Sequence, residues 1–204
     1  MKKQQIAKKI QTILTTLYPE PKASLQAKDS YTLLVAVMLS ANARDVIVNK
    51  ITPILFAKAD TPQKMVWMSV SEIESIIKPC GLGPQKAKAI WNMSRLLIEN
   101  FEGNVPQTFE ELESLPGIGH KTASVVLWHA FGKKTFPVDT HIHRCAKRWG
   151  LSSGTSVKQT EKDLRSLFPE SDWGRIHLQI IYFGREYCQA KRHDASICPI
   201  CSWL

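Results

Sequence analysis

The sequence predicts an all-α fold. Apolar residues recur at helical spacing through nearly the whole chain, and serine or threonine precedes several of these runs. The strict alternation of apolar and polar residues that marks a half-buried strand is missing, and so are internal repeats and low-complexity tracts. With 204 residues, 44% of them hydrophobic, the chain can bury the core of one large or two small domains.

The first half of the chain is expected to form a series of short helices. Ile6, Ile10 and Leu14 share one face of an amphipathic helix, which the pair of prolines at 19 and 21 ends. Ser30 is expected to cap a second helix that contains the apolar run 33–39, and a third helix spans 46–55 with Pro53 as a kink or early end. Thr61-Pro62 supplies an N-cap and a first-turn proline, and Ser71 with Glu74 forms a capping box. A further helix runs from Lys86 to Leu97, after the turn Gly81-Leu82-Gly83-Pro84.

A tight turn between two helices stands out in the second half. Thr108 followed by Glu111 is a capping box, so a helix should begin there. After the run Leu115-Pro116-Gly117-Ile118-Gly119-His120-Lys121-Thr122-Ala123, apolar residues again repeat at helical spacing until Gly132, a typical stop. The two glycines permit left-handed or crowded conformations and close approach of another backbone. The amides that begin the second helix can bind a phosphate.

The last third of the chain contains two further helix signals and most of the cysteines. Ser156 is expected to cap one helix, and Ser171 or Asp172 the next. The five cysteines are an odd number, and in a reducing cytosol they should not form structural disulfides. Three of them, which we call the C-terminal cysteine cluster, indicate a metal site: Cys188, Cys198 and Cys201.

Charge and hydropathy limit the kind of partner. The formal net charge is +9, which suits a polyanion such as nucleic acid, although an ordinary basic cytosolic protein would carry the same charge. No apolar run approaches the length of a membrane-spanning helix. The basic, polar first residues do not form a signal peptide. We therefore expect a cytoplasmic protein, associated with the nucleoid in a prokaryote, and no membrane partner.

Two motifs together carry a family resemblance. The run from Leu115 to Ala123 resembles the helix-hairpin-helix of DNA repair glycosylases, and with Val138-Asp139-Thr140-His141-Ile142 it resembles the endonuclease III family. Weaker similarity extends from about Leu33 to Cys201. The resemblance implies two helical lobes with a DNA-binding cleft between them: residues 22–134, including the hairpin at about 108–132, and residues 1–21 joined to 135–204. It also implies a monomer that acts on duplex DNA with damaged bases or abasic sites.

The resemblance implies that Lys121 and Asp139 are catalytic. An amine that attacks a sugar C1′ must be neutral, and both burial in a cleft and the positive end of a helix disfavour its ammonium form. Attack would release the base and leave a Schiff base, from which β-elimination cuts the strand. The hairpin alone would favour a phosphate-binding Lys121, and the Asp139 run favours the nucleophile. Asp139 could also simply cap the helix that follows it.

The resemblance further assigns DNA contacts. Asn42 stands where the family has a glutamine that fills the gap left by an extruded base, and it is one methylene shorter. Leu82 matches an apolar wedge, although a buried turn leucine is an equal interpretation. Other expected contacts are Gly117, Gly119, His141 and Arg144, with Lys133 and Lys134 as weaker electrostatic candidates. Lys86 and Lys88 are interpreted as solvated surface charges.

The C-terminal cysteine cluster resembles the family's 4Fe-4S ligands, but departs from them twice. The cluster needs four cysteines, and the sequence reaches Leu204 without the usual fourth. Nine residues separate Cys188 from Cys198 (198 − 188 − 1), more than in the family pattern. Three interpretations remain open: a 4Fe-4S cluster with a non-cysteine fourth ligand, a zinc or iron remnant, or no metal. Cys198-Pro199-Ile200-Cys201 is nevertheless a good chelating pair.

The predicted function is base excision repair. The chain is expected to be a DNA glycosylase and abasic-site lyase that removes oxidised pyrimidines and cleaves 3′ to the abasic site. An adenine or mismatch glycosylase of the same fold is disfavoured, because those relatives generally lack a lysine at position 121. A non-catalytic helix-hairpin-helix module would explain the charge and the hairpin, but not Lys121 and Asp139 together.

Overall fold

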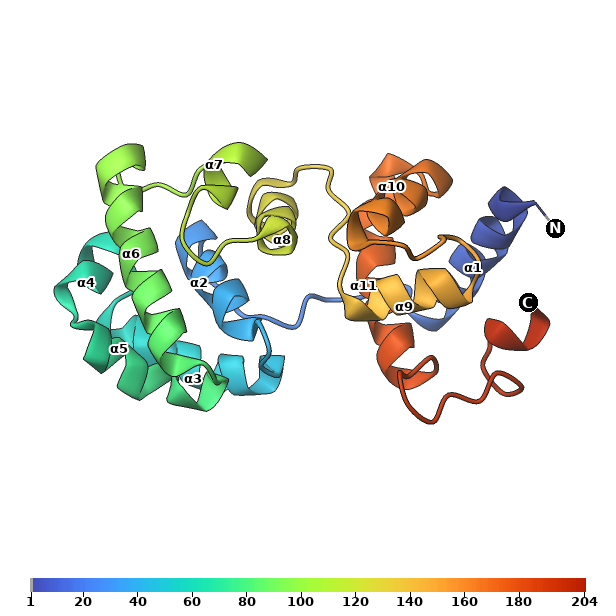
Figure 1. The fold of residues 1–204 in the computed structure, drawn as a ribbon, viewed down its shortest axis with the longest axis horizontal. Helices are drawn as coiled ribbons and strands as arrows, with labels where there is room; N and C mark the ends of the chain where they lie inside the picture. Colours follow the sequence, from blue (N-terminus) through green and yellow to red (C-terminus); the bar gives the residue numbers. More distant parts are fainter. Residues whose placement is uncertain (1) are drawn as a thin grey trace. The chain divides into compact units, whose positions relative to one another are not determined.

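The computed structural model describes residues 2–204 (Figure 1). The regular elements in that range are helices, and none is a strand, so the all-α prediction is confirmed. The chain forms two compact units. One is Ala23–Lys133, and the other joins the chain up to Lys22 to Lys134–Leu204. Within the described range, no helix has both the length and the apolar character needed to cross a membrane.

The unit Ala23–Lys133 is built around one buried helix, α2 (Ser30–Ser40). Every residue from Tyr31 to Leu39 is buried, as expected for a helix with neighbours on all sides. The short hydrophobic faces of the other helices complete this core. These helices are α3 (Asp45–Lys58), α4 (Pro62–Trp67), α5 (Val70–Ile77), the 3₁₀ turn η1 (Lys78–Cys80), α6 (Gly83–Phe101), α7 (Phe109–Glu113) and α8 (His120–Phe131).

Local sequence signals locate most of the helix ends in this unit, with three corrections. The Thr61 cap is confirmed, since its side chain accepts a hydrogen bond from the backbone N–H of Lys64. The cap of α2 is Asp29 rather than Ser30. The capping box of α5 is Ser69 with Glu72, two residues before the expected pair. Finally, α3 continues through Pro53 to Lys58 instead of ending early.

The second unit packs α1 against the C-terminal third of the chain. Its elements are α1 (Lys3–Leu17), α9 (Thr140–Arg148), α10 (Val157–Leu167), η2 (Glu170–Asp172), α11 (Trp173–Glu186) and η3 (Cys201–Trp203). Ala7, Ile10 and Leu14 are the buried face of α1. Ser156 caps α10 as expected, whereas Asp172 precedes α11 without a side-chain capping bond. After α11 the chain is irregular until η3 (red in Figure 1).

Lys86 is part of the fold and not a solvated surface charge, so that prediction was wrong. Its side chain is 8% exposed, and its ammonium donates to the carbonyl oxygens of Leu39 at 2.8 Å, Ala41 at 2.7 Å and Cys80 at 2.9 Å. Burial lowers the pKa of Lys86, with the neighbouring Cys80 thiol opposing that shift. One side chain on α6 thus joins the end of α2 to the turn before α6. Lys88, in contrast, is exposed.

Replacing Lys86 by methionine should destabilise the protein by about 2 kcal/mol, because three carbonyl oxygens lose their shared donor. Urea unfolding measures this change. Lys88→Met is the matched control on the same helix and should stay within about 0.5 kcal/mol of the wild type. Equal stabilities of the two variants would contradict a structural role for the Lys86 ammonium.

Candidate nucleic-acid interface

The hairpin between α7 and α8 has the predicted form, with one glycine that the backbone requires. Thr108 caps α7, and Gly132 ends α8 in the left-handed region at φ +64°. Gly117 lies in the turn at φ +80°, where a Cβ would be 2.9 Å from Met38 Cε and 3.0 Å from Ala89 Cβ. Gly119 has an ordinary φ of −101°, so the expected need for a special conformation is wrong there. A Cβ on Gly119 would meet nothing within 4 Å.

Lys121 is the second residue of α8, where the partial positive charge of the helix is greatest. Its side chain is exposed, so the expectation that burial helps to neutralise the amine is wrong for the protein alone. The preceding residue, His120, anchors this end of α8 to α7. Its ring stacks on Phe109 with centroids 4.8 Å apart, and its Nδ1 lies 2.7 Å from Glu113 Oε1. Sequence reasoning overlooked this anchor.

Two exposed loop residues in the same unit adopt left-handed backbone conformations. Leu82 is 54% exposed at φ +52°, which contradicts the interpretation as a buried turn leucine. Asn42 is exposed at φ +60°, a conformation that asparagine tolerates better than leucine. Lys86 binds the residue before Asn42, Ala41, and Cys80 in the Leu82 turn. The Lys86 ammonium therefore holds these two loops to each other.

Asp139 belongs to the other unit and caps α9. Its Oδ1 accepts a hydrogen bond from the backbone N–H of Ile142 at 2.8 Å. The capping interpretation is thereby confirmed, and it is compatible with chemistry, because a carboxylate has a second oxygen. The charge of Asp139 also acts on His141, whose pKa is lowered mainly by burial and is raised again in part by this carboxylate.

Arg144 makes several contacts within the second unit, and its assignment as a DNA contact stays a prediction. Its guanidinium donates to the carbonyl oxygen of Gly184 at 2.9 Å and to that of Cys188 at 3.0 Å. A further nitrogen lies 3.1 Å from His141 Nδ1. A guanidinium has five N–H groups, and these contacts use most of them. Lys133 and Lys134 are exposed.

The C-terminal cysteine cluster meets one histidine. The ligand atoms of Cys188, His193 and Cys201 all lie within 4.8 Å of one another, so they could hold a metal ion. The Cys198 sulfur accepts a hydrogen bond from the backbone N–H of Cys201 at 3.5 Å. Next to them, the buried Cys145 thiol donates to Cys188 and lowers the pKa of Cys188. Sequence reasoning did not include His193, although a histidine between metal-like cysteines is itself a signal.

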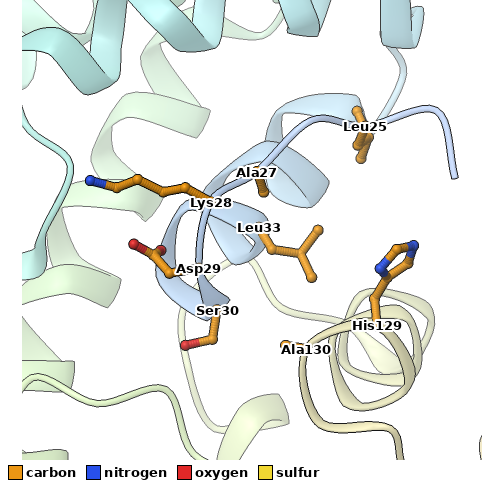
Figure 2. A pocket seen from close by; sticks show the side chains of 8 residues that line it. All are labelled: Leu25, Ala27, Lys28, Asp29, Ser30, Leu33, His129 and Ala130. Carbon is orange, nitrogen blue, oxygen red and sulfur yellow. The ribbon is translucent and has the colours of Figure 1, made fainter.

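A pocket at the other end of α8 contains none of the expected site residues (Figure 2). Leu25, Leu33 and His129 point into it from three segments of the first unit, while Lys28 extends away from His129. Lys121 stands eight positions before His129 (129 − 121) on the same helix, roughly 12 Å at 1.5 Å per residue. The pocket is therefore separate from the hairpin.

Comparisons with known proteins agree with this geometry. The family model of the HhH-GPD superfamily base excision DNA repair proteins matches residues 35–170. Endonuclease III of Rickettsia felis is 44% identical over 96% of this chain and 92% of its own length. Endonuclease III of Synechocystis is 42% identical over 97% of this chain and 91% of its own.

Solved structures are similar over the same extent. A non-covalent endonuclease III–DNA complex has a TM-score of 0.93 at 36% identity, covering 99% of this chain and 94% of that chain. A trapped endonuclease III–DNA covalent intermediate also has a TM-score of 0.93, at 37% identity, covering 98% of this chain and 94% of that chain. The chain belongs to the HhH-GPD superfamily of base excision DNA repair proteins and, within it, to the endonuclease III family.

Proposed function

We propose that this DNA glycosylase and abasic-site lyase removes oxidised pyrimidines, with Lys121 as the nucleophile of both steps. The observation that supports this role is the exposed amine of Lys121 at the positive end of α8, directly after a hairpin that can bind a phosphate. A relative captured as a covalent intermediate with DNA is consistent with an amine nucleophile. Duplex DNA is the proposed partner, the active form is a monomer, and in a bacterium the enzyme would act in the cytoplasm.

The two steps use the same nitrogen. The neutral amine forms a bond to C1′, the glycosidic bond breaks, and the base leaves with a proton. The sugar ring then opens, its O4′ oxygen takes up a proton, and the nitrogen, which keeps its second proton, becomes a protonated Schiff base. That cation acidifies the C2′ proton, whose removal breaks the bond from C3′ to its phosphate oxygen and cuts the strand. Water then releases the enzyme. Since Lys121 is exposed in the free protein, bound DNA would exclude water from the amine.

Asp139 is the proposed acceptor of the amine proton. A carboxylate close to an ammonium stabilises the charged form, which opposes nucleophilic attack. It can therefore help only by receiving the proton or by stabilising positive charge that develops on the sugar as the glycosidic bond breaks. Its Oδ1 already caps α9, which fixes the carboxylate and leaves the second oxygen for this purpose.

We propose that the loops of Leu82 and Asn42, the two residues with left-handed backbone conformations, help to extrude the base. A nucleotide must leave the helical stack before its C1′ can be attacked, and apolar wedges commonly keep the stack open. Leu82 has the exposure and the fixed backbone that a wedge needs, and Asn42 would enter the vacated space. We propose that Gly117 and Gly119 present backbone amides to a phosphate, helped by the open space beside Gly119. His141 remains a proposed DNA contact.

The 4Fe-4S cofactor implied by the family does not fit the donor atoms that are present. Such a cluster takes four cysteine thiolates, whereas this segment offers the thiolates of Cys188, Cys198 and Cys201 and the imidazole of His193. Each ligand of a cubane binds a different iron, so its ligand atoms stand farther apart than those that share one ion. Here three of them lie within 4.8 Å of one another. The proposed reaction therefore contains no step through an iron-sulfur cluster.

Borohydride trapping on DNA with an abasic site or thymine glycol tests the nucleophile. The wild type should form a covalent adduct, and Lys121→Ala should form at least about 10³-fold less while still binding the same DNA. Lys88→Ala, another exposed lysine, should trap like the wild type. Salt-sensitive binding without any adduct in the wild type would instead indicate a non-catalytic DNA-binding module.

Asp139→Asn separates capping from chemistry, because asparagine caps a helix as well as aspartate does. Single-turnover excision should fall about 10²-fold or more, since the proton acceptor is lost. The free energy of unfolding of Asp139→Asn, measured in urea, should differ from that of the wild type by less than about 0.5 kcal/mol. Asp139→Ala should lower it by about 1 kcal/mol, because the cap is lost. A folded Asp139→Asn variant with unchanged turnover would refute the catalytic role.

Leu82→Gly tests the wedge without disturbing the core. Glycine adopts φ +52° freely, so stability should change by less than about 1 kcal/mol. Excision from duplex DNA should fall by roughly 10-fold to 100-fold, because the variant cannot keep the stack open. Strand cleavage at a preformed abasic site in single-stranded DNA should fall much less. An equal loss on both substrates would argue against a wedge.

A further inference from the structure

The segment after α11 is irregular, yet parts of it are firmly buried. Residues 189–200 contain turns and bends but no helix. Cys188, Cys198 and Ile200 are nevertheless at most 1% exposed. A short irregular segment makes few backbone hydrogen bonds of its own, and proteins often hold such segments with a structural metal. The donor atoms within this segment and at its two ends indicate which metal would bind.

His193 lies in this irregular segment, and the environment of one of its ring nitrogens needs an explanation. Its Nε2 is buried, and within the described residues that atom has no hydrogen-bond partner. A buried ring nitrogen without a partner is unfavourable unless something binds it. The ligand atoms of Cys188 and Cys201 lie within 4.8 Å of a His193 ring nitrogen and of each other. The histidine with the unpartnered Nε2 thus lies beside two thiols, which are metal donors.

We propose that Cys188, His193, Cys198 and Cys201 bind a single zinc ion that staples the C-terminal segment to the second unit. Three soft thiolates and an imidazole select zinc over magnesium or calcium, and four protein ligands close the site against substrate. With bonds of about 2.0–2.3 Å, the ligand atoms of a tetrahedral zinc site stand roughly 3.7 Å apart. Small side-chain rotations would therefore bring Cys188, His193 and Cys201, whose ligand atoms lie within 4.8 Å of one another, onto one ion. The pair Cys198 and Cys201 supplies the chelating turn.

The surroundings of the site suit a charged metal centre. Arg148 Nη1 lies 3.5 Å from the Cys188 sulfur and 2.6 Å from the carbonyl oxygen of Gln189. Three thiolates around a divalent ion carry one net negative charge, which this guanidinium offsets. The backbone N–H of Cys201 donates to the Cys198 sulfur, as is usual around metal-bound thiolates. These contacts would orient the ligands and fix the irregular chain around them.

Metal analysis of the full-length protein, purified without added metal in the absence of oxygen, tests the proposal. We expect about one zinc per chain, no iron and no colour. X-ray absorption at the zinc edge should show three sulfur neighbours at about 2.3 Å and one nitrogen at about 2.0 Å. A brown protein with iron and sulfide would overturn the proposal in favour of a cluster. Protein that contains no metal, or zinc without a nitrogen neighbour, would overturn it as well.

Variants identify the fourth ligand. His193→Ala should lose at least about 10-fold in zinc affinity, measured by competition with a chromophoric chelator, and its second unit should unfold at a lower temperature. His193→Cys keeps a donor atom at this position and should retain zinc with four sulfur neighbours, which gives an answer even if His193→Ala does not fold. His129→Ala, in the other unit, is the control and should match the wild type. Full zinc affinity in folded His193→Ala would refute the assignment.

Discussion

The close approach of Gly117 to α2 and α6 is the constraint on which the candidate site depends. A Cβ at position 117 would lie 2.9 Å from Met38 Cε and 3.0 Å from Ala89 Cβ, so a side chain there would displace its neighbours, and a φ of +80° is strained for residues with a side chain. The contact fixes the hairpin against the buried helix of the first unit. The start of α8, with Lys121 in its first turn, thus belongs to the same compact unit as the loops of Leu82 and Asn42.

Much of this fold could be predicted because helix ends are local events. The caps at Thr61, Thr108 and Ser156 and the glycine stop at Gly132 depend on residues within one turn of each other. The same locality produced the errors at other helix starts. Where Ser69 and its neighbours offer several capping residues, spacing alone cannot choose among them, and packing of the helix against the core decides.

The parts of the site that could not be predicted depend on contacts between distant residues. Lys86 shares the face of Ile90 and Leu97, which is a signal of burial, but its acceptors come from two other segments. The carbonyl oxygens that accept hydrogen bonds from Arg144 belong to Gly184 in α11 and to Cys188, both far from it in the sequence. The interpretation of His193 as a metal ligand depends on cysteines that lie before and after it in the sequence. The exposure of Lys121 likewise follows from packing that no motif records.

The chemistry proposed here requires one specific nitrogen to form the bond to DNA. Mass spectrometry of a trypsin digest of the borohydride-trapped complex locates that bond directly. Trypsin cuts the free chain into residues 96–121 and 122–133, and it does not cut after a modified lysine. We expect a single adduct on an uncut peptide covering 96–133. An adduct on the terminal amine or on any other lysine, with cleavage after Lys121 intact, would contradict the account.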